Sequence, residues 1–218
     1  MTKKIAIVLA GCGVMDGSEI HEAVLTLLAI DKHGAIYQCF APDIPQAQVI
    51  NHITGEEMQG ETRNVLIESA RICRGKIMPL SEYMPQDYDA LIFPGGFGAA
   101  KNLFTFALDG PDFTIDPDVK RAVLETRQHN KPIGALCISP VLLAKLVEGV
   151  TVTIGSDKSV AAAIKGPLKA RHTVTNHGEL TIDEKHNIVT TPCYMLNASI
   201  SQIAQGTDNL VREILNRA

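Results

Sequence analysis

The chain has 218 residues, of which 45% are hydrophobic and 20% are charged. This length and composition suffice for one sizeable core, so we expect a single domain over residues 1–218. The net charge is −4, and a chain without a basic excess lacks the field that holds nucleic acid or an anionic membrane. No apolar segment approaches the roughly 18 residues that a membrane-spanning helix needs. We therefore expect neither nucleic acid nor a membrane as a partner.

Five cysteines lie far apart in the sequence and form no Cys-x-x-Cys pair. Their odd number argues against a disulfide framework, and their spacing argues against a structural zinc site. The apolar run at residues 5–11 ends in a glycine-rich polar stretch, which is typical of a first strand and not of a signal peptide. These features predict free thiols in a cytoplasmic protein.

Strand-like and helix-like segments alternate along most of the chain. In order, the patterns predict a strand at 5–10, a helix at 19–33, a strand at 35–42, a helix at 62–72, a strand at 88–96, a helix at 116–130, a strand at 131–137 and a helix at 140–149. Asp116 and Pro117 suit the N-cap and first helical position of one helix, and Gly34 suits the end of another. Repeated strand–helix units imply a parallel sheet with helices on both faces.

After residue 150 the pattern changes to shorter segments. Four short strands are expected at 150–155, 170–176, 178–183 and 187–192, with a hairpin turn near 183–187 and a final helix at 198–216. The predicted fold class is α/β, a three-layer α/β/α sandwich around a mostly parallel, flavodoxin-like sheet. Ligands of such sheets bind beyond the carboxyl ends of the strands, so residues at those ends are the candidates for function.

Cys137 is the first candidate, because it stands where the strand at 131–137 meets the helix at 140–149. A sharp turn there would expose a nucleophile and place it at a helix N-terminus, whose dipole lowers a thiol pKa. A free cysteine can also be a packed core residue, and the position alone leaves both interpretations open.

Two other strand ends carry residues that suit chemistry. Gly95 and Gly96 follow the strand at 88–96, where paired glycines can leave N–H groups free for an oxyanion or can simply end a strand. Glu19 and Glu22 lie in the first turn of the helix at 19–33. Acidic residues suit any helix N-terminus, but a glutamate that faces a thiol could act as its acid or base.

The remaining candidates are weaker. Cys12, in the glycine loop after the first strand, is expected to be packed or incidental. His177 and Glu179 form a His-x-Glu pair that could complete a cysteine triad. The same stretch lies between strand-like segments, and an exposed pair without a catalytic role is the favoured interpretation.

Together, the GSE-x-x-E-A-V motif, the PGG loop and the cysteine turn resemble the PfpI superfamily, which has the class I glutamine-amidotransferase-like fold. The segments GCGVMDGSEIHEAVLTLL, INHITGE, ETRNVLIESARI, PGGFGAAKNL and TTPCYML are similar to its ElbB-type glyoxalases. The resemblance implies that Cys137 is the nucleophile in a nucleophile elbow and Glu22 the proton shuttle. It also implies that the backbone of Gly95, Gly96 and Ile138 binds the substrate oxyanion.

The activity that this resemblance implies is a lyase reaction, in which glyoxal or methylglyoxal becomes glycolate or lactate through a cysteine hemithioacetal. It implies no metal or other cofactor, a small dicarbonyl as substrate, and a homodimer. Ile138 departs from protease-like relatives, which place a histidine directly after the nucleophile. Two alternatives remain: a redox-sensing or partner-binding protein with a reactive Cys137, and a glutaminase-like amide hydrolase dependent on His177. A link to isoprenoid biosynthesis has no visible basis in these residues.

Overall fold

The computed structural model describes residues 2–218 and contains one large sheet with the strand order β3-β2-β1-β4-β5-β9-β8. Its strands are β1 (Lys4–Val8), β2 (Ile36–Ala41), β3 (Ile77–Pro79), β4 (Ala90–Phe93), β5 (Ile133–Leu136), β8 (Thr181–Asp183) and β9 (Ile188–Thr191). Neighbouring strands are parallel except β8 and β9, which are antiparallel. A separate two-stranded sheet pairs β6 (Thr151–Val152) with β7 (Arg171–His172). The predicted mostly parallel, flavodoxin-like sheet is confirmed.

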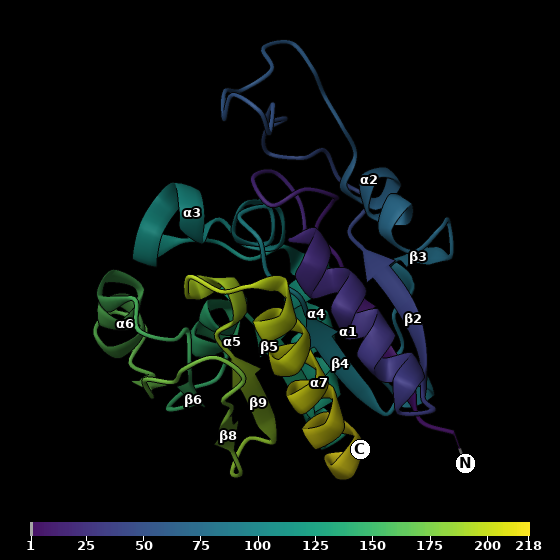
Figure 1. Ribbon diagram of the computed structural model, residues 1–218, viewed down its shortest axis with the longest axis vertical. Coiled ribbons are helices and arrows are strands. Elements are labelled where there is room, and N and C mark those ends of the chain that lie inside the picture. Colours follow the sequence, from purple (N-terminus) through teal and green to yellow (C-terminus); the bar gives the residue numbers. More distant parts are fainter. Residues whose placement is uncertain (1) are drawn as a thin grey trace.

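Helices cover both faces of the large sheet. The α-helices of the described residues are α1 (Ile20–Lys32), α2 (Val65–Ile72), α3 (Phe106–Asp109), α4 (Pro117–Gln128), α5 (Pro140–Leu146), α6 (Lys158–Lys165) and α7 (Ile200–Arg217). α1 and α7 lie side by side on one face, while α4 and α5 pack on the other (Figure 1). This arrangement confirms the predicted three-layer α/β/α sandwich.

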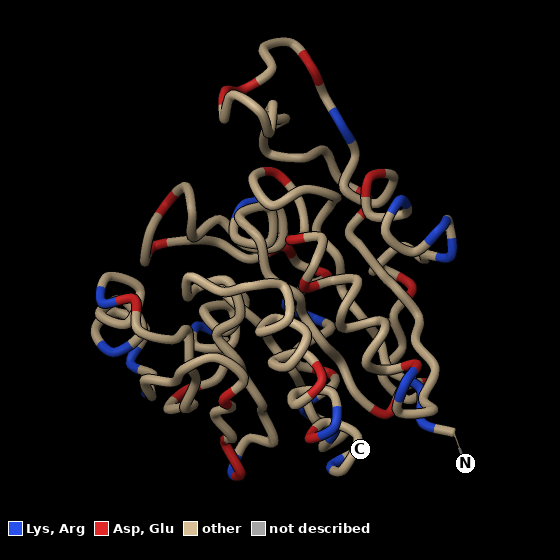
Figure 2. Tube along the Cα trace, viewed as in Figure 1, with Lys and Arg blue, Asp and Glu red and all other residues tan. Residues whose placement is uncertain are grey.

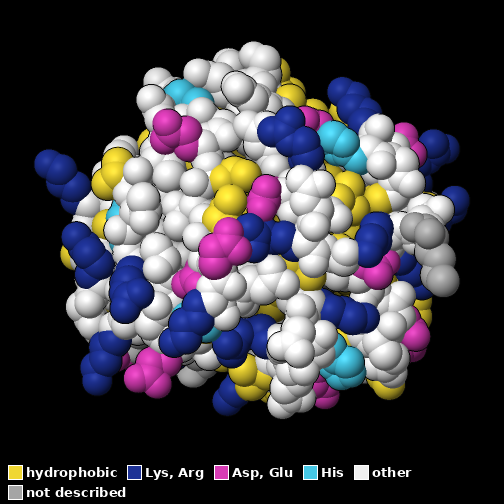
Figure 3. Space-filling model, turned by 90° about the horizontal axis from the view of Figure 1, so that it is seen from below, with side chains coloured by type: hydrophobic (Ala, Val, Ile, Leu, Met, Phe, Trp, Pro, Cys, Tyr) yellow, Lys and Arg dark blue, Asp and Glu magenta, His cyan; other side chains and the backbone are white. Residues whose placement is uncertain are grey.

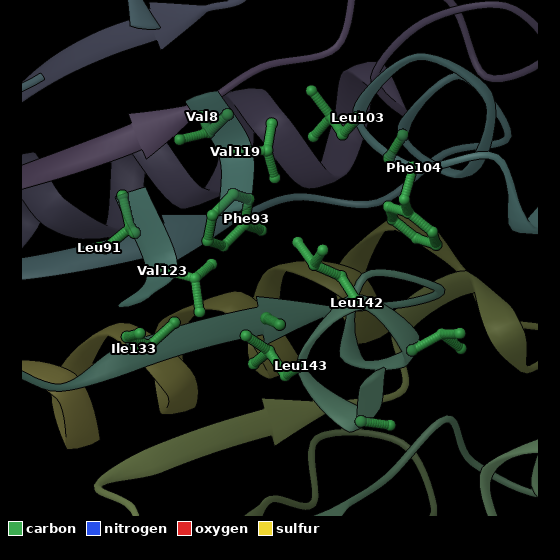
Figure 4. Packing of buried hydrophobic residues seen from close by; sticks show 14 of the residues in the cluster. Val8, Leu91, Phe93, Leu103, Phe104, Val119, Val123, Ile133, Leu142 and Leu143 are labelled. Carbon is green, nitrogen blue, oxygen red and sulfur yellow. The ribbon is translucent and has the colours of Figure 1, made fainter. Parts of the chain in front are cut away.

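The inner strands are buried on both faces, as their continuous apolar runs predict. In β1, Val8 belongs to the core beneath α4 and α5, whereas Ile7 belongs to the core beneath α1 and α7. Figure 4 shows Phe93 of β4 lying between Val119 and Val123 of α4. Because alternate residues of a strand point to opposite faces, one short run supplies both cores.

Several elements differ from the sequence expectation. α3, α6 and β3 are not predicted, and the strand expected at 170–176 shrinks to β7 outside the large sheet. Asp157 was an available signal for α6, since its side chain accepts a hydrogen bond from the Val160 N–H at 2.9 Å and so caps the helix. The predicted hairpin near 183–187 is confirmed by the antiparallel pairing of β8 and β9.

The carboxyl ends of the parallel strands gather at one edge of the sheet, at the top of Figure 1, where the long segment 42–64 also stands out. Figure 2 shows Lys and Arg interspersed with Asp and Glu along the chain. The opposite face, in Figure 3, mixes both charge signs with hydrophobic side chains. No helix within residues 2–218 has the length and apolar character required to cross a membrane.

Candidate active site

The structure places Cys137 on the turn between β5 and α5. Its φ of +59° lies in the left-handed region, which residues other than glycine seldom adopt. The Cys137 N–H donates to the Thr191 carbonyl at 3.0 Å, so β9 holds the turn in place. The expectation that this turn is exposed is wrong, because loops from neighbouring strand ends cover Cys137 and leave it 7% exposed.

Glu22 lies in the first turn of α1 and is fully buried against Cys137. Its carboxyl lies beside the thiol, since a Cβ placed on Gly95 would be 2.8 Å from Glu22 Oε2 and 2.9 Å from the Cys137 sulfur. It accepts backbone N–H bonds from Gly95 at 2.9 Å and Tyr194 at 3.2 Å. Glu19 is the N-cap of α1, since its side chain accepts the Glu22 N–H at 2.7 Å. The two glutamates of this turn therefore have different positions: Glu19 caps the helix, and Glu22 faces the thiol.

Burial controls the proton affinity of both reactive groups. It raises the pKa of Glu22 to about 8, with a further increase from the negative charge of Glu19. Burial also raises the pKa of the Cys137 thiol well above its usual value, and the charge of Glu22 adds to this. The predicted lowering of the thiol pKa by the dipole of α5 is wrong, because the loss of solvation outweighs the favourable contacts with backbone amides.

The paired glycines let the backbone pass very close to the nucleophile. A Cβ on Gly95 would lie 2.4 Å from the Cβ of Cys137, and a Cβ on Gly96 would lie 2.5 Å from the Glu19 nitrogen. Gly96 also has a φ of +109°, which favours glycine. No larger residue fits at either position without movement of the chain.

The backbone amides around Cys137 differ in what they bind. The Gly95 N–H donates to Glu22 at 2.9 Å, so the carboxyl already engages this amide, and the oxyanion role implied for it stays a prediction. The amides of Gly96 and Ile138 instead favour the charged form of the Cys137 sulfur and oppose the rise of its pKa. These two N–H groups are the ones in position to stabilise negative charge at the reacting atoms.

The turn after β9 brings in residues that the sequence did not assign to the site. Tyr194 donates its N–H to Glu22, and its hydroxyl is hydrogen-bonded to His21 Nδ1 at 2.8 Å. Cys193 is buried beside the pair, and desolvation together with the charges of Glu22 and Cys137 raises its pKa. The available signal was the TTPCYML segment, which begins in the last residues of the strand expected at 187–192 and so continues beyond the same edge of the sheet.

A cavity of about 360 Å³ opens above the thiol. It is lined by Val14, Glu19, Gly96, Phe97, Ala100, Phe106, Ala107, Cys137, Ile138, Asp157, Val160, Tyr194 and Met195. His177, Glu179 and Cys12 do not belong to this lining. Glu179 accepts the Asn176 N–H in a surface turn, in agreement with the favoured interpretation of the His-x-Glu pair. Within residues 2–218, no group of three or more His, Cys, Asp or Glu side chains could hold a metal ion.

Known proteins resemble the chain over nearly its whole length. The human "glutamine amidotransferase-like class 1 domain-containing protein 3, mitochondrial" is 48% identical over 221 residues, which cover 97% of this chain and 82% of the relative. No protein-family model matches the chain. The crystal structure of an isoprenoid biosynthesis protein with an amidotransferase-like domain from Ehrlichia chaffeensis has a TM-score of 0.90 and 37% identity, covering 99% of this chain and 100% of that one.

A more distant structure, glyoxalase III from Candida albicans, has a TM-score of 0.63 and 13% identity, and covers 99% of this chain and 97% of that chain. At this identity the likeness extends to the fold alone.

The comparisons contradict the predicted cytoplasmic location. The human relative is named mitochondrial. The ES1 protein homologue of Rattus norvegicus is named mitochondrial too, and it is 46% identical over 97% of this chain and 83% of the relative. The ES1 protein of Danio rerio, also named mitochondrial, is 33% identical over 97% of this chain and 84% of the relative. The prediction rested on free cysteines and on the reading of the first apolar run as a strand and not a signal peptide. Neither feature selects the cytoplasm, because free thiols fit any reducing compartment.

Proposed function

The chain belongs to the family of the glutamine amidotransferase-like class 1 domain-containing and ES1 proteins, and we propose that it is a cofactor-independent glyoxalase of the ElbB type. One observation supports this proposal above others: a buried carboxyl, Glu22, lies beside a thiol, Cys137, at the wall of a cavity. A thiol can add to an aldehyde, and a carboxyl beside it can then move a proton between adjacent carbons.

The first step forms a bond between the Cys137 sulfur and the aldehyde carbon. The thiol proton passes to the aldehyde oxygen, so the product is a hemithioacetal. As the bond forms, negative charge moves from sulfur to the aldehyde oxygen, two bonds away. The Gly96 and Ile138 amides, which favour the charged form of the Cys137 sulfur, stabilise that charge.

The second step is an internal oxidation and reduction. Ionised Glu22 removes the proton from the carbon attached to sulfur, which gives an enediol, and returns it to the neighbouring carbon. The first carbon is thereby oxidised to a thioester and the second is reduced to an alcohol. Water then cleaves the thioester, releases the 2-hydroxy acid and restores the Cys137 thiol.

This chemistry requires the active-site pair to lose one proton. With the pKa of Glu22 at about 8 and that of Cys137 raised, both groups are protonated at neutral pH. The state with one proton can hold either a carboxylate beside a thiol or a thiolate beside a carboxylic acid. Exchange between these forms supplies the nucleophile for the first step and the base for the second.

The proposal is tested by 2-hydroxy-acid formation from glyoxal and methylglyoxal without glutathione. Cys137→Ser and Glu22→Gln should each lower kcat/KM at least ~100-fold, the range of a lost nucleophile or general base. Cys12→Ser and Glu179→Gln are matched controls outside the cavity and should retain wild-type rates. Full activity in Glu22→Gln would exclude the proton shuttle.

The rival functions give different results in the same preparations. A redox sensor would show Cys137 oxidation by mild peroxide with no aldehyde turnover. An amide hydrolase would release ammonia from glutamine and lose this activity in His177→Ala, although His177 does not line the cavity.

A homodimer is a separate proposal, taken from the family resemblance. Ile20, Val24 and Leu28 repeat every four residues along α1 and are each 42–43% exposed, which suits a helix face that packs against a second copy. Val24→Glu should then convert a dimer into a monomer in light scattering. A wild-type monomer would contradict the proposal.

A further inference from the structure

The cavity above Cys137 is much larger than glyoxal. A water molecule occupies about 30 Å³ in the liquid, so a cavity of about 360 Å³ has room for about a dozen waters. Glyoxal has only four heavy atoms and would leave most of this space unfilled. A volume above about 300 Å³ is in the range of pockets that enclose larger organic ligands.

Most of the wall is apolar. The side chains that surround the space beyond the thiol are those of Val14, Phe97, Ala100, Phe106, Ala107, Ile138, Val160 and Met195. They come from separate parts of the fold, including Phe106 on α3 and Val160 on α6. Contact between this wall and a small polar dicarbonyl contributes little free energy of binding. An apolar group of the substrate would be removed from water there, which favours binding.

The charged groups at the cavity are acidic. Glu19 and Asp157 contribute carboxylates, each also acting as a helix N-cap, and no Lys or Arg belongs to the lining among the described residues. Lys101, on the helical turn after the PGG loop, instead donates to the Met15 carbonyl at 2.9 Å. A carboxylate or phosphate on the substrate would therefore meet like charge without a compensating cation.

From the size, wall and charge of this cavity, we propose that the substrate is a 2-oxoaldehyde whose ketone carbon carries an uncharged apolar group of about the size of a phenyl ring. This inference rests on the proposed glyoxalase function and names its substrate class. The aldehyde reaches Cys137, while the apolar group lies against Phe106 and Val160.

Three aldehydes test this proposal: phenylglyoxal, its para-carboxylated analogue and glyoxal. The two aryl compounds share the reacting atoms and differ by one carboxylate. We expect the initial-rate kcat/KM of phenylglyoxal to exceed that of the carboxylated analogue and that of glyoxal by at least ~10-fold each, the discrimination that apolar pockets reach.

A pair of variants tests the location of the apolar group. Ala107 is exposed on α3 and lines the cavity, whereas its neighbour Leu108 is also exposed and does not. Ala107→Phe should therefore reduce the ratio of the phenylglyoxal rate to the glyoxal rate at least ~10-fold. Leu108→Phe adds an aromatic ring to the same helix and should leave both rates unchanged.

The outcomes separate the two proposals. Turnover of glyoxal that equals or exceeds that of phenylglyoxal would overturn the substrate class and leave the glyoxalase function intact. Equal turnover of the two aryl compounds, or a preference for the carboxylated one, would overturn the selection against charge. Turnover of none of the three would refute the glyoxalase function, and the substrate class with it.

Discussion

Replacement of Glu22 by glutamine should change how the stability of the protein depends on pH. The carboxyl has a pKa of about 8 in the folded chain, against an ordinary value of 4.5. Folding therefore takes up a proton between these two pH values. The uptake of this proton stabilises the folded chain. This contribution is fully present below pH 4.5 and is lost as pH rises through about 8. At 1.36 kcal/mol for each pH unit, the whole difference is about 5 kcal/mol.

Glutamine cannot ionise, so the variant lacks this dependence. Both oxygens of Glu22 accept backbone N–H bonds, one from Gly95 and one from Tyr194, and glutamine can replace only one of them. The amide left without an acceptor costs about 1–3 kcal/mol at every pH. Glu22→Gln should therefore be less stable than the wild type at low pH, and this difference in free energy of unfolding should shrink steadily as pH rises.

Urea unfolding of both proteins at pH 5.5 and pH 7.5 measures the effect. The difference in free energy of unfolding should move by about 2.7 kcal/mol in favour of the variant over these two pH units. Glu179→Gln, at an exposed glutamate, controls for the loss of one negative charge. A difference between Glu22→Gln and the wild type that stays constant with pH would refute the raised pKa and the one-proton mechanism built on it.

Three further predictions concern the rate and the packing. The kcat/KM for the dicarbonyl should rise about tenfold per pH unit below about pH 8 and level off above it, because the active-site pair must lose one proton; a flat pH profile would contradict this. Gly95→Ala places a methyl group 2.4 Å from the Cβ of Cys137 and should lower the free energy of unfolding by about 1–3 kcal/mol and abolish turnover. Gly206→Ala, inside α7 with its nearest neighbour at 3.4 Å, should instead stabilise by about 0.5–1 kcal/mol, so equal melting temperatures for the two variants would count against the steric account. Tyr83→Phe removes a buried hydroxyl hydrogen-bonded to Thr126 at 2.7 Å and should cost about 1 kcal/mol in urea unfolding, whereas an unchanged midpoint would mean that this bond adds nothing.

Local patterns in the sequence predict most of the sandwich. The apolar run at 5–10 becomes a strand buried on both faces, and Asp116 caps α4 through hydrogen bonds from the first-turn amides. These features depend on neighbouring residues, whose periodicity and capping groups the sequence displays directly. The strand-end position of Cys137 follows from the same patterns, and the family motif adds Glu22 as its partner.

Short elements are not predicted because few residues carry their periodicity, even where a capping residue such as Asp157 is present. α6 has eight residues between strand-like segments, and β3 has three. β9 was expected as a strand, but no local feature places it beside β5 in the large sheet. That pairing carries Cys193 and Tyr194 to the active-site pair, so two neighbours of Glu22 remained unassigned.

The sequence by itself determined the layered fold and the edge of the sheet at which chemistry could occur, because strand and helix periods are properties of adjacent residues. Only the tertiary structure decided the electrostatics of the site. The burial of Cys137, the raised pKa of Glu22 and the use of the Gly95 amide by that carboxyl all arise from segments far apart in the chain. Desolvation depends on everything that surrounds a group, so no local pattern in the sequence reveals it.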